Sequence, residues 1–194
     1  GIASFFSYSV LISRCRFTGF TQSGILGVNS GIEIEGGTIF DDNNFGIDMS
    51  NFMLGSPLTS WLKFTGSEFQ RHLFDHNTSA HIRLDNTIGV MPDNFTRGAL
   101  IRYTDFIGPA PGIFICNPSF YRIQECSFET ENMPGIAGCS SGQPGDFQRF
   151  VLCNAFNNCD RAITFFGENR DVILWSNNFT NNSTDLLVTA YTDN

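Results

Sequence analysis

Histidine, arginine and aspartate side chains that could do acid–base chemistry alternate along one short stretch of the chain. In "HIRLD", His81, Arg83 and Asp85 are separated by apolar residues, so on a β-strand all three would share one face. His72 and His76 come shortly before them. Such a face could be a general acid–base site or a sugar-binding strip, and it could equally be an ordinary polar outer surface.

A pair of carboxylates, Asp41 and Asp42, is the second candidate for catalysis. Glycoside hydrolysis needs two carboxylates that face one cleft, and β-elimination on uronates uses a basic residue with a carboxylate-bound calcium ion. Adjacent residues of an extended segment point to opposite faces, however, and a turn would explain the pair without catalysis. With Asp48, the same pair could form a calcium-dependent sugar-binding module.

Sequence motifs of several other chemistries are absent. The chain has no phosphate-binding loop, nucleophile elbow or metalloprotease motif. It also has no Cys-x-x-Cys pair of the kind that favours zinc. We therefore predict no cofactor and no metal site, and we lean towards a protein that is not an enzyme.

The charge of the chain restricts its partners. Its 194 residues carry a formal net charge of −8 with only 11 Lys and Arg, which argues against binding nucleic acid or an anionic membrane. No apolar run approaches the roughly 18 residues of a membrane span. Carbohydrate and other protein subunits are the expected partners. We expect one domain over residues 1–194, and the start at Gly1 suggests a piece of a longer protein.

The elements that must position these residues come from an internal repeat. Phenylalanines recur at spacings of 23, 29, 37, 22, 28 and 23 residues, at Phe17, Phe40, Phe69, Phe106, Phe128, Phe156 and Phe179. Apolar residues follow most of these anchors after seven or eight positions, at Ile25, Ile47, Ile113, Ile136, Ile163 and Leu186, and the longer copy after Phe69 resumes at Ile82. Because these positions persist while the copies differ in length, the insertions fall in loops, as a solenoid requires.

Positions upstream of the anchors keep the same frame. The residue five before the anchor is apolar in every copy except at Glu35, and the residue two before it is small, as at Thr38 and Asn177. Period-two segments such as "GIEIEG" and "VILWSN" are bounded by Gly, Asn or Pro, and none shows the period of a helix. The sequence predicts an all-β, right-handed, single-stranded parallel β-helix of about seven coils.

On these features the chain resembles the right-handed parallel β-helix, or pectate-lyase-like, superfamily over about residues 9–190. The resemblance implies an architecture shared by pectin-degrading enzymes, phage tailspikes and surface adhesins. Polygalacturonases of this fold carry Asn-Thr-Asp, Asp-Asp, Gly-His-Gly and Arg-Ile-Lys elements, of which only the Asp-Asp pair occurs here. "FDDN" at 40–43 and "FTNN" at 179–182 are also similar to the Phe-x-x-Asn repeats of chlamydial polymorphic outer-membrane proteins.

Six cysteines can be placed in the repeat frame. Cys116 and Cys139 each follow a repeat isoleucine by three residues, so stacking of neighbouring coils would bring them within disulfide range. We predict a disulfide between these two. The sequence leaves open the pairing of Cys15, Cys126, Cys153 and Cys159.

Five Asn-x-Ser/Thr sequons begin at Asn77, Asn94, Asn178, Asn181 and Asn182. A repeat built from Asn, Ser and Thr creates sequons by itself, but in a eukaryotic secreted chain some would carry glycans. Together with the predicted disulfide, the sequons favour an extracellular glycoprotein, secreted or attached to a surface.

The leading prediction is a non-catalytic extracellular β-helix that serves as a rigid structural, adhesive or assembly element. The alternative is a polysaccharide-active β-helix enzyme, which would be a lyase, a hydrolase or a phage tailspike depolymerase. Its site would lie in the long coil between Phe69 and Phe106.

Overall fold

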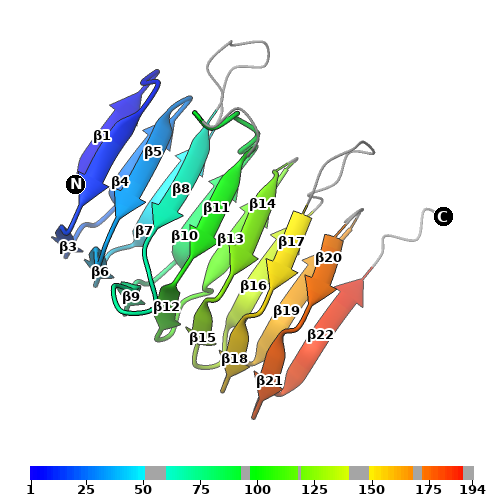
Figure 1. Ribbon diagram of the computed structural model, residues 1–194. Coiled ribbons are helices and arrows are strands. Elements are labelled where there is room, and N and C mark those ends of the chain that lie inside the picture. Colours follow the sequence, from blue (N-terminus) through cyan, green and yellow to red (C-terminus); the bar gives the residue numbers. More distant parts are fainter. Residues whose placement is uncertain (51–59, 93–96, 118, 140–148, 168–171, 190–194) are drawn as a thin grey trace.

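The computed structural model describes residues 1–50, 60–92, 97–117, 119–139, 149–167 and 172–189, and these contain strands and no helix (Figure 1). Sheet A has the order β1 (Ile2–Phe5), β4 (Ser23–Val28), β7 (Phe45–Ser50), β10 (Ala80–Asp85), β13 (Ile113–Cys116), β16 (Pro134–Cys139), β19 (Arg161–Phe166) and β22 (Thr184–Thr189). Sheet B contains β2 (Val10–Ser13), β5 (Gly31–Glu35), β8 (Trp61–Thr65), β11 (Ala99–Arg102), β14 (Tyr121–Gln124), β17 (Arg149–Leu152) and β20 (Val172–Trp175). Sheet C contains β3 (Arg16–Thr18), β6 (Ile39–Asp41), β9 (His72–Asp75), β12 (Thr104–Ile107), β15 (Ser127–Glu129), β18 (Ala155–Asn157) and β21 (Asn178–Thr180).

The chain visits sheets A, B and C in turn, and every strand pairs in parallel with its equivalent in the next coil, as β1 does with β4 and β4 with β7. We number the coils from coil 1 (β1 to β3) to coil 7 (β19 to β21), and β22 begins a further coil. The N-terminal coil therefore lies at one end of the stack and the C-terminal coil at the other (Figure 1). The prediction of a parallel β-helix of about seven coils is confirmed. Among the described residues, no helix could cross a membrane.

A continuous stack of phenylalanine rings fills the interior beside sheet C. Its members are Phe17, Phe40, Phe74, Phe106, Phe128, Phe156 and Phe179. Neighbouring ring centroids are 4.5 to 5.4 Å apart, which is close to the spacing of adjacent strands in a sheet. Ile25, Ile47, Ile82 and their equivalents form a parallel ladder on the inner side of sheet A.

One repeat anchor was assigned wrongly from the sequence. Phe69 is 94% exposed, and Phe74 takes its place in the ring stack. The residues before β9 form a small excursion in which the Gln70 amide donates to the Ser67 carbonyl, so the chain reaches sheet C five residues later than the phenylalanine spacing suggested. Counted from Phe74, Ile82 follows after eight residues, within the interval of seven or eight that the other copies show. The exception at Glu35 has a similar cause, because Ile34 is the inward residue and its partner in the next coil is Phe64.

Asparagine ladders hold the corners between the sheets. The Asn77 side-chain oxygen, Oδ1, accepts a hydrogen bond from the Asn43 backbone amide at 3.0 Å. The side-chain nitrogen of Asn77 donates to the Phe40 backbone carbonyl at 3.2 Å. Asn154 and Asn177 repeat this pattern two residues before their anchors. Each side-chain amide therefore satisfies two backbone groups of the preceding coil, at a corner where the strand ladder is interrupted.

Candidate functional site

The structure separates the three residues of the predicted HIRLD face. His81 is fully buried, whereas Arg83 and Asp85 lie on the outer side of sheet A. The prediction that they share one face is therefore wrong. Ala80, His81 and Ile82 are all buried because the chain is still leaving a corner at the start of β10, and strict alternation begins only at Ile82.

His81 occupies an interior position where the neighbouring coils carry glycine. Gly46 is the preceding equivalent, and a Cβ there would lie 2.6 Å from the Phe74 ring. The imidazole instead packs with its centroid 6.1 Å from Phe74 and 6.0 Å from Phe106, and its Nδ1 lies 2.9 Å from the Asn77 amide nitrogen. Burial lowers the pKa of His81 to about 3, so the ring is neutral and serves as packing.

The outer face of sheet A brings together a different set, Asp48, Arg83 and Asp85, which we call the sheet A cluster. Asp48 and Arg83 are direct partners on β7 and β10. Arg83 Nε lies 3.3 Å from Asp48 Oδ1, and Arg83 Nη2 lies 3.8 Å from Asp85 Oδ2. Asn117 donates to Asp85 Oδ1 at 2.5 Å. The guanidinium therefore lies between two carboxylates from adjacent coils.

Asp48 is a member of this cluster whose side-chain pKa is raised above its ordinary value. Burial raises the pKa of Asp48, the Arg83 charge opposes that change, and the Asp85 charge adds to it. A carboxyl group with a raised pKa next to a second carboxylate is an arrangement used for general acid catalysis. The sequence offered one signal for this pairing, because the alignment of Ile47 with Ile82 places Asp48 beside Arg83.

The Asp41 and Asp42 pair belongs to another surface. Asp41 ends β6 on sheet C, while Asp42 is exposed in the following corner. Since Asp48 lies on sheet A, the three aspartates predicted for a calcium-dependent module do not form one site.

Asp41 has a closer acidic neighbour that the sequence search did not pair with it. Asp75 is its partner on β9, and ligand atoms of Asp41, Asp75 and His76 lie within 4.8 Å of one another. Such oxygen and nitrogen donors could hold a divalent cation. However, Arg16 Nη2 lies 2.8 Å from Asp41 Oδ2 and His76 Nδ1 lies 2.6 Å from Asp75 Oδ1, so both carboxylates already have partners.

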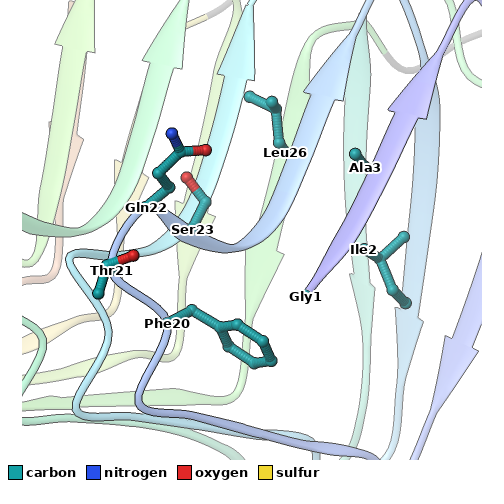
Figure 2. Close-up of a pocket in the computed structure, with 8 residues that line it drawn as sticks. All are labelled: Gly1, Ile2, Ala3, Phe20, Thr21, Gln22, Ser23 and Leu26. Carbon is teal, nitrogen blue, oxygen red and sulfur yellow. The ribbon is translucent and has the colours of Figure 1, made fainter.

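Two open pockets in the described part of the chain lie away from the sheet A cluster. Figure 2 shows a pocket of about 280 Å³ between β1 and the segment leading into β4, with the Phe20 ring and the Gln22 and Ser23 side chains at its wall. Another of about 280 Å³ lies at a corner between sheets B and C, lined by Arg14, Gln70 and their neighbours. Neither is lined by any residue of the sheet A cluster.

Cys116 and Cys139 are direct partners on β13 and β16, and their Sγ atoms lie 2.6 Å apart. The structure carries both as free cysteines, so the disulfide stays a prediction. Cys126 and Cys159 are buried, while Cys15 and Cys153 are exposed.

The sequons differ in their surroundings. Asn77 is fully buried, and a glycan on its amide would be incompatible with this fold. Asn178 and Asn181 are exposed, whereas the Asn182 amide donates to the Phe156 carbonyl. Asn94 lies outside the described residues.

The chain matches no protein-family model, no curated protein and no solved structure.

Proposed function

We propose that this chain is a non-catalytic β-helix module that works outside the cell as a rigid structural, adhesive or assembly element. The observation that carries this proposal is the unbroken interior, in which stacked rings run from Phe17 to Phe179 and corner amides connect one coil to the next. Such an interior resists bending, because every coil between the two ends is packed on two neighbours. The histidine that suggested chemistry belongs to this interior.

Two features support an extracellular setting. Asn178 and Asn181 present their sequons on an exposed surface, and Cys116 lies beside Cys139 where an oxidising environment would join them. Secretion from a eukaryotic host should therefore give glycopeptides that contain Asn178 or Asn181 and none modified at Asn77. Peptide mass spectrometry detects glycans at each of these positions. A glycan on Asn77 in the folded protein would contradict the buried position of that side chain.

A second candidate function, a polysaccharide-active enzyme, is favoured by one observation. Asp48 has a raised pKa and lies beside Arg83, with Asp85 on the same coil as that arginine. In this case Asp48 would donate a proton to the leaving oxygen of a glycosidic bond, while Asp85 would act as the base or nucleophile.

The experiment that separates the two functions uses a panel of acidic and neutral polysaccharides, with and without calcium. Reducing-end and unsaturated-uronate assays are run on the parent chain, on Asp48→Asn and on Asp105→Asn. Asp105 is a matched control because it pairs with Arg71 at 2.7 Å on sheet C. The scaffold function predicts no turnover by any of the three proteins. Turnover that Asp48→Asn abolishes and Asp105→Asn preserves would establish the enzyme instead.

A further inference from the structure

The outward side chains of sheet B change in character from one end of the stack to the other. Along each sheet B strand, the second and fourth or third and fifth residues point outward, as the alternating burial shows. From coil 1 to coil 7 the outward residues are Leu11 and Ser13, Glu33 and Glu35, Lys63 and Thr65, Leu100 and Arg102, Arg122 and Gln124, Phe150 and Leu152, and Ile173 and Trp175. We call this set the sheet B face.

Charge on the sheet B face changes sign along the axis of the stack. Coil 2 contributes Glu33 and Glu35, whereas coils 4 and 5 contribute Arg102 and Arg122. Apolar side chains lie beyond both charged zones: in coil 1, Leu11 is 61% exposed, and in coil 7, Trp175 is 66% exposed. From coil 1 to coil 7, the sheet B face is thus apolar, then acidic, then basic, then apolar again.

Most of the charges in these zones lack an ionic partner among the residues that the structure describes. Lys63 pairs with Glu33 at 2.7 Å, which leaves Glu35. Arg122 Nε donates to the Gln124 side chain at 2.6 Å and its guanidinium lies 5.8 Å from the centre of the Phe150 ring, while Arg102 lies 6.0 Å from the Tyr103 ring. Among the described residues, neither arginine and no atom of Glu35 takes part in an ion pair. Arginine and aromatic side chains are both enriched at protein–protein contacts.

We propose that the sheet B face binds the same face of a second copy of this chain, with the two stacks antiparallel. A two-fold axis along the strand direction, between coils 3 and 4, would set coil 2 of each copy against coil 5 of the other. Glu33 and Glu35 would then face Arg122, and Leu11 would lie over the apolar residues that begin with Phe150. A contact of this type is isologous, since each copy contributes the same surface.

Charge decides between the antiparallel and the parallel arrangement. In a parallel pair each coil would face its own equivalent, so glutamates would oppose glutamates and arginines would oppose arginines. Like charges held against each other at a contact strongly disfavour it. Only the antiparallel pair brings each acidic zone against a basic one. It also sets Lys63 opposite Arg102, but the Lys63 charge is already paired with Glu33 of its own chain.

The dimensions of the face predict the strength of this contact. A strand of four residues is about 13 Å long, and seven coils at about 4.8 Å extend for about 30 Å, which gives roughly 400 Å² per copy. Stable interfaces bury about 800 Å² per partner. The dimer should therefore be weak, dependent on concentration and sensitive to salt.

Sedimentation equilibrium over a concentration series, at low and at high salt, tests this directly. The parent should form a dimer that salt weakens. Arg122→Glu and Glu35→Arg should each weaken association at least tenfold, and the double variant should return it to within a few-fold of the parent because the charges are exchanged. Arg161→Glu on sheet A is the matched control, since it makes the same change in net charge away from the face.

A parent that stays monomeric throughout the series overturns the proposal. Three other results would also overturn it. These are assembly beyond the dimer, a double variant that associates no more tightly than the single variants, and an equal loss of association in Arg161→Glu. Circular dichroism confirms that each variant is folded. The inference rests on the proposed scaffold function and names its partner. The two can fail separately. Polysaccharide turnover would refute the scaffold function and leave the dimer standing, whereas a monomeric parent would refute the dimer and leave the scaffold function standing.

Discussion

At the scale of single residues, His81 shows how one buried side chain changes the response of the whole fold to acid. Its ring fills an interior position that is glycine in the preceding coil, between Phe74 and Phe106. Burial lowers its pKa from 6.5 to about 3. His72, also buried, has its pKa lowered for the same reason, and the Thr65 carbonyl partly opposes the shift.

We predict that unfolding becomes easier as the pH falls below about 6.5. The unfolded chain binds a proton at His81 there, while the folded chain does not until about pH 3, so the stability contributed by His81 is complete above 6.5 and is lost progressively towards 3. The loss amounts to about 1.4 kcal/mol per pH unit. Urea unfolding at pH 7, 6 and 5 measures it.

The control for this prediction is His81→Ala, because Ala162 occupies the equivalent position in coil 7. The variant should be less stable at pH 7, owing to the lost ring, and should have a smaller slope with pH. Asp48 is present in both proteins, so the difference isolates His81. Equal slopes would show that folding does not lower the pKa of His81.

The thiols of Cys116 and Cys139 give a second prediction at this scale. Because the two residues are direct partners across β13 and β16, we expect them to form a disulfide in the secreted protein. Such a bond closes a loop that should contribute up to about 3 kcal/mol. Peptide mapping without reducing agent decides the matter, and two alkylatable thiols in protein from an oxidising host would refute the bond.

At the scale of elements, the corners matter as much as the strands. Asn77 lies in the corner between β9 and β10, where it accepts from the Asn43 backbone at 3.0 Å and donates to the Phe40 carbonyl at 3.2 Å. These bonds connect coils 2 and 3. A corner amide therefore replaces the strand ladder where the ladder stops.

We predict that Asn77→Ala costs about 1 to 3 kcal/mol for each buried group left without a partner. Asn178→Ala is the matched control, because Asn178 is an exposed asparagine in β21 and its loss should change stability by about 0.5 kcal/mol or less. Chemical unfolding compares the two variants. Equal effects would mean that the corner amides contribute no more than surface residues.

The repeat made the fold predictable, whereas the site depended on details that periodicity does not contain. Inward phenylalanines such as Phe40 and Phe106 recur at fixed distances from inward isoleucines, and this pattern already predicts stacked coils. The prediction that Phe69 is a repeat anchor was wrong because a short excursion before β9 delays the buried phenylalanine of this coil to Phe74. The prediction of an outward-facing His81 was wrong because the second residue of a sheet A strand still points inward.

At the scale of the whole molecule, coil 3 determines whether the chain is one continuous body. It contains the excursion that displaced the expected anchor, and its ring, Phe74, lies 4.5 Å from Phe40 on one side and 5.2 Å from Phe106 on the other. If these contacts hold, coils 1 and 2 unfold together with coils 4 to 7. A rigid scaffold requires this continuity.

The most direct test of this central claim is urea unfolding of Phe74→Ala beside Phe69→Ala, followed by circular dichroism and by tryptophan fluorescence. Phe74 is fully buried and Phe69 is exposed, so the first change should cost about 3 to 5 kcal/mol and the second about 0.5 kcal/mol or less. Both variants should keep a single transition that coincides for the two probes. A larger effect from Phe69→Ala, or two separate transitions in the parent chain, would contradict the continuous β-helix on which the scaffold function depends.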